Sequence, residues 1–236
     1  MTAWTTRRAG SIPVRISPPG GGGATPPPAS AGLRRGGSGR SSRPSWAGRG
    51  TLSSGGYPRP VRPEPDFIAG RELPGRAWEL AAGAYAGPGV AEGAGVEHPV
   101  AVAALVDAAG FDADAVAAAL LHDLVEDTPA TVETVAAELG PGIGGWVAAL
   151  TEDASIAEYG ERKAEHRIRV LDAGGVPASI YLADKLDRVR TLVAAGTVVD
   201  PDRLDHYRAT FELFAARRPE LPFLAELAAE LPRLEA

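Results

Sequence analysis

Residues 118–128 have the sequence AALLHDLVEDT, and the rest of the chain can be understood as a scaffold for this stretch. On a helix with about 100° between successive residues, its leucines and valine fall on one side. Its four polar side chains fall on the other side: His122, Asp123, Glu126 and Asp127. Three carboxylates this close together repel one another unless a cation lies among them. The stretch therefore predicts a helix with an apolar face in the core and a metal ion on its polar face.

The first 63 residues differ in composition from the rest of the chain. They contain 13 Gly and 10 Pro, more than a third of the stretch, and Gly/Pro content this high without a period is typical of disorder. We therefore expect a disordered Gly/Pro/Ser/Arg-rich tail at residues 1–70 and one folded domain at residues 71–236. A mis-set start codon and a transit peptide are the alternatives for the tail, although its glycines and prolines argue against the amphipathic helix of a transit peptide.

The net charge changes from positive to negative at the same boundary. Residues 1–63 hold ten arginines and no acid, whereas residues 64–236 hold 14 Lys and Arg against 30 Asp and Glu, so that the whole chain carries −6. A domain this acidic does not attract nucleic acid through its overall field. Contact with nucleic acid is expected only weakly, through the arginine-rich tail.

Several classes of protein are excluded by what the sequence lacks. The chain has no cysteine, which excludes disulfides, thiolate metal sites and cysteine nucleophiles and suits a reducing compartment. No apolar run approaches the roughly 18 residues that span a membrane, and the N-terminus has no hydrophobic signal-peptide core. We expect a cytoplasmic protein without a membrane partner. None of these features indicates an oligomeric state.

Helix signals recur from about residue 71 to the C-terminus. Asp112 or Asp114, Thr131 and Asp200 are suited to N-cap positions, and Pro99 to the first residue of a helix with His98 as its N-cap. No run of alternating β-branched residues predicts a strand. Besides the helix that carries residues 118–128, helices are expected at residues 75–85, 99–109, 131–139, 142–151, 158–172, 177–195, 200–217 and 222–231. The domain is predicted to be all-α.

The glycine-rich motif GPGIGG at residues 140–145 matches the pattern G-x-G-x-x-G. A dinucleotide site needs a strand before this pattern, and a helix pattern precedes it here, so a turn between two helices is the favoured interpretation. The sequence also has no G-x-S-x-G elbow and no P-loop, which leaves serine hydrolases and Walker NTPases unsupported.

Histidine and carboxylate remain as the groups that carry chemistry. The chain has four histidines: His98, His122, His166 and His206. The last two lie in charged or amphipathic stretches and are expected at the surface or partly buried. His122 and Asp123 point about 100° apart on a helix, so other elements must complete a shared metal site, and His98 and Asp184 are the plausible contributors. Such a mixed N/O set suits Mn²⁺, Fe²⁺, Zn²⁺ or Mg²⁺, while a solvated acidic patch is the alternative from spacing alone.

Four motifs in this order carry a resemblance: HPV at residues 98–100, LLHDLVEDT at 120–128, TED at 151–153 and LADKLDRVR at 182–190. Together they resemble the HD-domain metallophosphohydrolases, and more narrowly the hydrolase domain of the RelA/SpoT alarmone family and its small single-domain relatives. The resemblance runs from about residue 76 to residue 216. Each motif alone is a weak signal, whereas their combination is specific.

The resemblance implies an all-α HD-domain helical bundle that holds one divalent metal, usually Mn²⁺, with Zn²⁺, Fe²⁺ and Mg²⁺ as alternatives. By this resemblance the metal ligands are His98, His122, Asp123 and Asp184. The pair Glu126 and Asp127 would position and deprotonate the attacking water. The implied reaction removes the 3′-pyrophosphate of guanosine tetra- or pentaphosphate (ppGpp or pppGpp), the alarmones of the stringent response.

Basic and aromatic residues downstream are candidates for contact with a small phosphorylated nucleotide. Those nearest to the metal motif are Lys185, Arg188 and Arg190. Weaker candidates for the same pocket wall are Arg162, Lys163, Arg203 and Tyr207.

Two departures from the family pattern concern the substrate. The segment before the first metal histidine is usually basic and carries Tyr-Ile before His-Pro, but here no Lys or Arg lies between Arg76 and His98. The usual Asn of the ADKL-x-N-L-R motif is Arg188. An HD phosphatase or pyrophosphatase acting on another phosphorylated small molecule, and a nucleotide-sensing HD protein without turnover, are therefore the alternatives to a ppGpp hydrolase.

Overall fold

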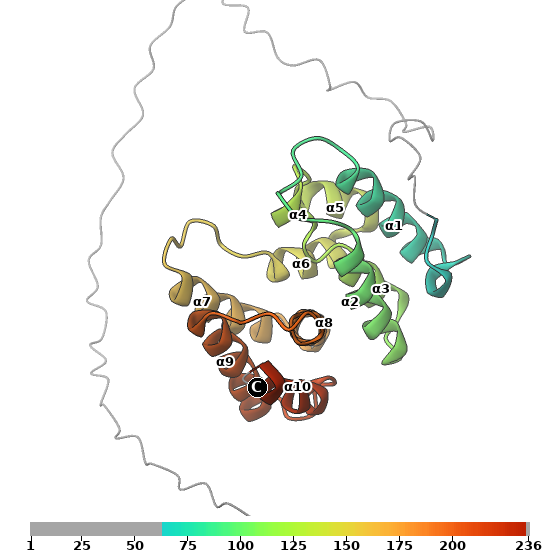
Figure 1. The fold of residues 1–236 in the computed structure, drawn as a ribbon. Coiled ribbons are helices and arrows are strands. Elements are labelled where there is room, and N and C mark those ends of the chain that lie inside the picture. Colours follow the sequence, from blue (N-terminus) through green and yellow to red (C-terminus); the bar gives the residue numbers. More distant parts are fainter. Residues whose placement is uncertain (1–62, 235–236) are drawn as a thin grey trace, which may run out of the picture. The chain divides into compact units, whose positions relative to one another are not determined.

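A computed structural model describes residues 63–234, and the tail predicted for the N-terminus lies outside these residues up to position 62. All regular structure in the described part is helical, as predicted (Figure 1). The elements are η1 (Asp66–Ile68), α1 (Glu72–Tyr85), α2 (Glu97–Ala108), α3 (Ala113–Leu120), α4 (Leu124–Asp127), α5 (Val132–Leu139), α6 (Pro141–Leu150), α7 (Tyr159–Asp172), α8 (Gly175–Ala194), α9 (Pro201–Arg217), α10 (Leu224–Glu230) and η2 (Leu231–Leu234).

Helix α8 is the element around which the others pack. It contacts α2, α3, α6, α7 and α10, and Figure 1 shows it end-on between the helices of the N-terminal half and α7, α9 and α10. Ile180, Leu182 and Leu186 have no exposed surface, as expected for a helix that is apolar on most sides. Asp184 is buried on the same helix, so its charge needs partners inside the protein.

Small residues bring the neighbouring helices close together. Every residue from position 115 to position 121, on α3 and just after it, is fully buried. Four of these seven residues are alanine and one is valine. In α6 a Cβ atom added to Gly144 would lie 2.7 Å from the Cβ of Ala136 in α5. The glycine-rich motif at residues 140–145 therefore follows a helix and serves helix packing.

The capping signals in the sequence act as predicted. The Asp112 side chain accepts a hydrogen bond from the backbone N–H of Ala115 at the start of α3 (3.0 Å). Thr131 accepts one from the Thr134 N–H (3.3 Å), and Asp200 accepts one from the Arg203 N–H (2.9 Å). Each side chain satisfies a backbone donor that has no partner within its helix.

Two local predictions are wrong in detail. Helix α2 begins at Glu97, so Pro99 is its third residue and His98 lies inside the helix instead of capping it. Proline is tolerated there because backbone N–H groups of the first turn have no acceptor within the helix. Ile68, which lies in the stretch assigned to the tail, is part of η1 and has no exposed surface.

The stretch at residues 118–128 is not one continuous helix. Helix α3 ends at Leu120 and α4 begins at Leu124. Between them the Leu121 N–H donates to the Ala118 carbonyl (3.1 Å) and the Leu124 N–H to the Leu121 carbonyl (3.0 Å), which is the tighter i→i+3 pattern of a 3₁₀ turn. Side-chain directions calculated for an ideal α-helix are therefore wrong for His122 and Asp123. Among the described residues, no helix is both long and apolar enough to cross a membrane.

Candidate metal centre and cleft

Four side chains from three parts of the sequence meet beside α8. His98 comes from α2, His122 and Asp123 from the turn between α3 and α4, and Asp184 from α8. Single ligand atoms of His98, His122 and Asp184 all lie within 4.8 Å of one another. His98 Nε2 lies 3.1 Å from an Asp184 oxygen and 3.6 Å from an Asp123 oxygen. The structure thus brings together the four residues that the sequence resemblance assigned to a metal.

The break after α3 explains how two adjacent residues face the same point. His122 Nε2 lies 3.2 Å from Asp123 Oδ1, although a regular α-helix would direct the two side chains about 100° apart. The Nδ1–H of His122 donates to the Ala119 carbonyl at 2.8 Å. Because a carbonyl only accepts, the neutral form of His122 carries its proton on Nδ1, and its Nε2 is then able to bind a cation.

A second contact orients the other histidine in the same way. His98 Nδ1–H donates to Asp187 Oδ2 at 2.6 Å, so His98 Nε2 also faces the centre. The buried His122 Nε2 has no hydrogen-bond partner in the described structure. Two imidazole nitrogens with oriented outer partners and two carboxylates are a donor set that fits a divalent metal ion.

Two basic side chains border the carboxylates of this centre. Lys185 Nζ lies 2.6 Å from Asp184 Oδ2, and Arg188 Nη2 lies 3.1 Å from Asp123 Oδ2. Burial alone would raise the pKa of Asp184, but the charge of Lys185 and the hydrogen bond from His98 hold it well below its usual range. Asp184 is therefore ionised at neutral pH and able to bind a cation.

Glu126 and Asp127 lie on α4, directly after the turn that carries His122 and Asp123. The Tyr85 hydroxyl donates to Asp127 Oδ2 (2.8 Å), and the Glu152 backbone N–H donates to Glu126 Oε1 (2.8 Å). Each carboxylate thus has one oxygen held and one left for another partner. Burial of part of the carboxyl group raises the pKa of Glu126 to about 7, helped by the charge of Asp123, although its side chain keeps an exposed face. Burial also raises the pKa of Asp127.

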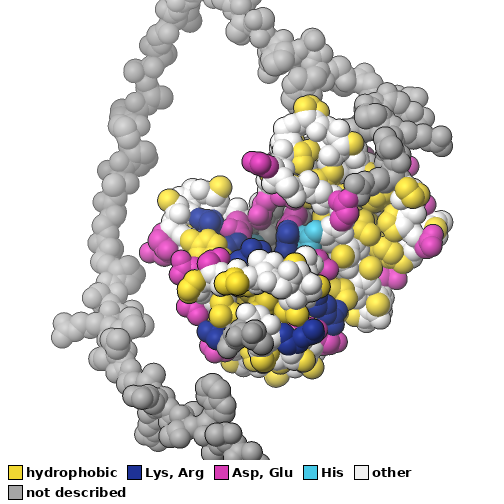
Figure 2. Space-filling model, in the orientation of Figure 1, with side chains coloured by type: hydrophobic (Ala, Val, Ile, Leu, Met, Phe, Trp, Pro, Cys, Tyr) yellow, Lys and Arg dark blue, Asp and Glu magenta, His cyan; other side chains and the backbone are white. Residues whose placement is uncertain are grey.

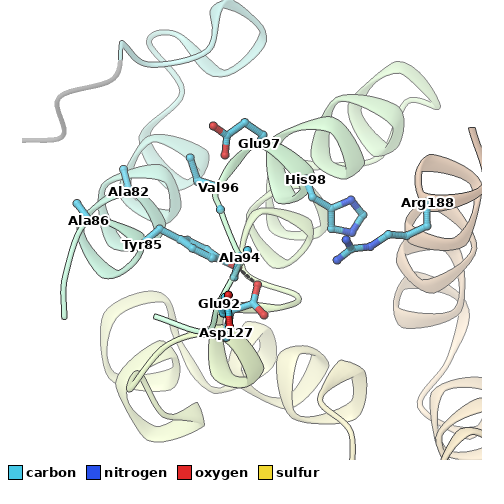
Figure 3. A pocket seen from close by; sticks show the side chains of 13 residues that line it. Ala82, Tyr85, Ala86, Glu92, Ala94, Val96, Glu97, His98, Asp127 and Arg188 are labelled. Carbon is cyan, nitrogen blue, oxygen red and sulfur yellow. Dashed lines mark hydrogen bonds between the residues drawn. The ribbon is translucent and has the colours of Figure 1, made fainter. Parts of the chain in front are cut away.

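Two cavities share Asp127 and Arg188 and therefore meet at this centre. The larger, of about 680 Å³, is bordered by α1 and the Gly/Ala-rich segment before His98. Figure 3 shows Tyr85 joined to Asp127 on one side of this cavity, with His98 and Arg188 pointing toward one another on the other side. The smaller cavity, of about 310 Å³, lies among α7, α8 and α9.

The predicted substrate-contact residues divide into two groups. Five of them line the smaller cavity: Lys163, Lys185, Arg188, Arg203 and Tyr207. The other two lie elsewhere in the structure. Arg162 donates to Glu152 (2.9 Å) and to the Ile156 carbonyl (2.9 Å), and Arg190 pairs with Glu230 of α10 at 3.7 Å. Arg162 and Arg190 therefore hold the protein together instead of facing the cleft.

His166 and His206 are buried, with 3% and 6% of their surface exposed, so the expectation that they lie at the surface or are only partly buried is wrong for both. Both line the smaller cavity. Arg167 donates to His206 Nδ1 at 2.8 Å, and burial together with nearby lysine charge lowers the pKa of His206 to about 2. His206 is therefore neutral with its proton on Nε2, a buried donor that has no partner in the described structure.

Sequence reasoning missed three residues that shape the site: Tyr85, Glu152 and Asp187. Asp187 was detectable, because a residue three positions after Asp184 lies on the same helix face. Glu152 belongs to the TED motif at residues 151–153 but received no role, whereas the structure pairs its carboxylate with Lys163 and Arg162. No sequence signal points to Tyr85, which reaches Asp127 across 42 residues.

Known proteins are similar in sequence to parts of this chain. A Drosophila melanogaster guanosine-3′,5′-bis(diphosphate) 3′-pyrophosphohydrolase, MESH1, is 39% identical over 118 residues, which cover 48% of this chain and 64% of that protein. An Aquifex aeolicus protein with the same enzyme name is 34% identical over 97 residues, which cover 40% of this chain and 14% of that protein. The chain thus spans less than two thirds of the length of these curated relatives.

Solved structures share the helical fold. One, described as a metazoan ortholog of SpoT that hydrolyzes ppGpp, has a TM-score of 0.57 and 26% identity and covers 70% of this chain and 96% of its own. A Listeria monocytogenes EGD-e protein, lmo0812, has a TM-score of 0.54 and 25% identity and covers 62% of this chain and 100% of its own. The HD domain family matches residues 77–219, which is more than half of the sequence. The chain belongs to the HD-domain family.

Proposed function

We propose that the protein is a Mn²⁺-dependent phosphohydrolase that removes the 3′-pyrophosphate from guanosine 3′,5′-bis(diphosphate) or a related nucleotide. The observation that carries this proposal is the meeting of His98, His122, Asp123 and Asp184 beside the carboxylates of α4 and a cleft that also holds lysine and arginine side chains. The relatives named as guanosine-3′,5′-bis(diphosphate) 3′-pyrophosphohydrolases support the choice of substrate.

The four ligands would hold the metal, with Asp187 and the Ala119 carbonyl orienting the two imidazoles. A divalent ion bound there lowers the pKa of a water molecule and neutralises phosphate charge. Nitrogen and carboxylate ligands suit Mn²⁺, and Fe²⁺, Zn²⁺ and Mg²⁺ are the alternatives to be compared with it.

The carboxylates of α4, Glu126 and Asp127, would position and deprotonate the attacking water. In the reaction, water oxygen bonds to the phosphorus on the 3′-oxygen, the bond between that phosphorus and the 3′-oxygen breaks, and the nucleoside side leaves with a hydroxyl as pyrophosphate is released. Asp127 is held by Tyr85 and Glu126 by the Glu152 N–H, so each keeps one oxygen for the water and its proton. A positioned carboxylate of this kind typically contributes 10²–10⁴-fold to a hydrolysis rate.

The smaller cavity would receive the departing pyrophosphate. Lys163 and Lys185 lie on its walls, and Arg203 donates to the Tyr207 hydroxyl oxygen at 3.1 Å. That bond leaves the Tyr207 proton free to donate to a phosphate oxygen. Together with the neutral His206, these groups offer several donors to the anion and place the positive charge where the product charge gathers.

Two other functions compete with this one. Hydrolysis of another phosphorylated small molecule is favoured by the lack of Lys and Arg in the segment before His98. A nucleotide sensor without turnover is disfavoured, because Glu126 and Asp127 are held next to the centre by Glu152 and Tyr85, respectively. We place the protein in the cytoplasm and in alarmone turnover during the stringent response, in keeping with its lack of cysteine.

The test is turnover by the purified full chain with Mn²⁺ and guanosine 3′,5′-bis(diphosphate), measured as release of pyrophosphate. We expect release that depends on the metal and that falls at least about 100-fold in Asp127→Asn. Metal-dependent release that Asp127→Asn leaves unchanged would refute the assignment of this residue. No release from any 3′-phosphorylated nucleotide would refute the proposed function.

A further inference from the structure

We propose that the preferred substrate carries its charge at one end: a nucleotide with a 3′-pyrophosphate and at most a single phosphate on the 5′ side. This inference rests on the proposed function and concerns the part of the nucleotide that remains after pyrophosphate has left. The observation behind it is that the two cavities beside the metal centre differ in their basic side chains: the smaller is lined by four Lys and Arg residues and the larger by one.

The difference begins in the sequence. No Lys or Arg occurs between Arg76 and Arg162, whereas the same stretch holds fifteen Asp and Glu. This stretch contains most of α1 and all of α2 to α6. Every residue that these helices and their loops contribute to the site is therefore neutral or acidic, apart from the metal histidines.

The larger cavity takes its walls from this acidic half. Glu92, Glu97 and Asp127 line it, and Arg188 is the only Lys or Arg among its lining residues. Arg188 is already engaged, because its guanidinium lies 3.1 Å from Asp123 and 3.7 Å from Asp184. A phosphate placed here would meet mostly like charge.

The smaller cavity differs in holding several cations beside its carboxylates, which are Asp123, Glu126, Asp127, Glu152 and Asp184. Lys163, Lys185 and Arg203 line it from α7, α8 and α9, which follow the acidic stretch in the sequence. Figure 2 shows basic side chains, in dark blue, gathered beside a histidine, in cyan, within the hollow. Pyrophosphate released at the metal therefore belongs on this side, and the nucleoside belongs in the larger cavity.

The walls of the larger cavity suit an uncharged nucleoside. Ala82, Ala86, Ala94 and Val96 supply apolar surface, and Tyr85 supplies an aromatic ring. A volume of about 680 Å³ is within the range of pockets that enclose a ligand of this size. Since the only Lys or Arg in this lining is an arginine that already pairs with Asp123 and Asp184, each phosphate added to the 5′ position lacks a matching cation.

The experiment compares four guanosine 3′-diphosphates that carry zero, one, two or three phosphates on the 5′ side, each with the full chain and Mn²⁺. We expect kcat/KM to fall about five- to tenfold for each phosphate beyond the first, and the differences to shrink with added salt. Calorimetry gives a readout without turnover: guanosine 5′-monophosphate should bind more tightly than guanosine 5′-diphosphate.

Charge variants locate the effect. Glu92→Lys and Ala91→Lys place a cation at exposed positions of the segment that lines the larger cavity. Both should raise the ratio of kcat/KM for the 5′-diphosphate to kcat/KM for the 5′-hydroxyl compound, by about five- to tenfold or more. Glu79→Lys makes the same charge change at an exposed position of α1 outside the cavity and should leave the ratio unchanged.

The outcomes separate the two proposals. If Mn²⁺-loaded protein hydrolyses none of the four compounds, the proposed function fails. If it hydrolyses them and kcat/KM is constant within about twofold or rises with the number of 5′-phosphates, the function stands and the inference is overturned. An unchanged ratio in both lysine variants would overturn it as well.

Discussion

Asp187 Oδ2 lies 2.6 Å from His98 Nδ1 and accepts a hydrogen bond from its N–H. Asp187 is three residues after Asp184 on α8, so one helix carries a proposed ligand carboxylate and also the acid that orients the proposed ligand histidine of α2. In the neutral ring of His98 this bond places the proton on Nδ1, so that Nε2 could bind the proposed metal.

Asp187→Asn is expected to weaken metal binding by about 10- to 100-fold, because the histidine loses the acceptor that orients it and raises its basicity. Titration of metal-free protein with Mn²⁺ measures the affinity. Asp172→Asn makes the same change at an exposed position at the end of α7 and should leave it unaltered. Equal affinity in the two variants would show that Asp187 does not support the centre.

Tyr85→Phe is expected to move the acidic limb of the pH–rate profile to higher pH. The Tyr85 hydroxyl lowers the pKa of Asp127 by donating to its carboxylate, and burial raises that pKa. Without the hydroxyl the pKa of Asp127 rises, and more alkaline solution is needed to ionise it. The rate at the optimum should fall about 2- to 10-fold, as for one lost hydrogen bond. An acidic limb at the same pH as in wild type would show that Tyr85 does not influence the ionisation of Asp127 during the reaction.

Glu152→Gln is expected to lower the free energy of unfolding by about 1–3 kcal/mol at pH 7. Burial would raise the pKa of Glu152, but the nearby His166, with its Nδ1 3.8 Å away, and the hydrogen bonds from Lys163 and Arg162 hold it well below its usual range. A depressed pKa stabilises the fold above the unfolded value of about 4.3, and this contribution is lost as the pH falls below it. Urea denaturation at pH 7, 5 and 3 should therefore show a shrinking difference from wild type.

The control for this prediction is Glu165→Gln. Glu165 pairs with Arg169 on the surface of α7, where its side chain is 37% exposed. Its loss should cost less than about 0.5 kcal/mol. A pH-independent loss in Glu152→Gln would mean that packing of this side chain, and not its charge, stabilises the protein.

Gly144→Ala is expected to destabilise the protein by about 1–3 kcal/mol, because the new Cβ would overlap with Ala136 of the neighbouring helix. Gly145→Ala has no atom within 4 Å of the new Cβ and should be neutral or stabilise by up to about 1 kcal/mol, since alanine favours the helix. Thermal unfolding of the two variants measures the contrast. Equal melting temperatures would show that α5 and α6 can move apart at no cost.

Arg203→Gln is expected to raise KM at least about tenfold, because a charged donor to the pyrophosphate is lost from the smaller cavity. Arg190→Gln should leave KM unchanged, since Arg190 pairs with Glu230 outside both cavities. Steady-state kinetics on the best substrate separates the two. A KM that rises in Arg190→Gln but not in Arg203→Gln would place the phosphate on the other side of α8.

Much of the local structure follows from short-range signals in the sequence. Asp112, Thr131 and Asp200 cap the helices that they were predicted to cap, and α9 (Pro201–Arg217) begins and ends where its proline and charge pattern indicate. These features depend on hydrogen bonds within a few residues, so that sequence neighbours are enough to predict them. The order of the HP, LLHD-x-VEDT and LADKL motifs likewise identified the candidate ligands before any geometry was known.

The sequence by itself thus determined an all-α domain and the residue types that its centre offers. Only the tertiary structure decided how they meet: His98 lies next to Asp184 across 86 residues, and His122 turns toward Asp123 because α3 ends early. The tertiary structure also decided that His166 and His206 are buried and that Tyr85 contacts Asp127. The physical reason is that such contacts follow from packing apolar helix faces around α8, and packing depends on all the faces together.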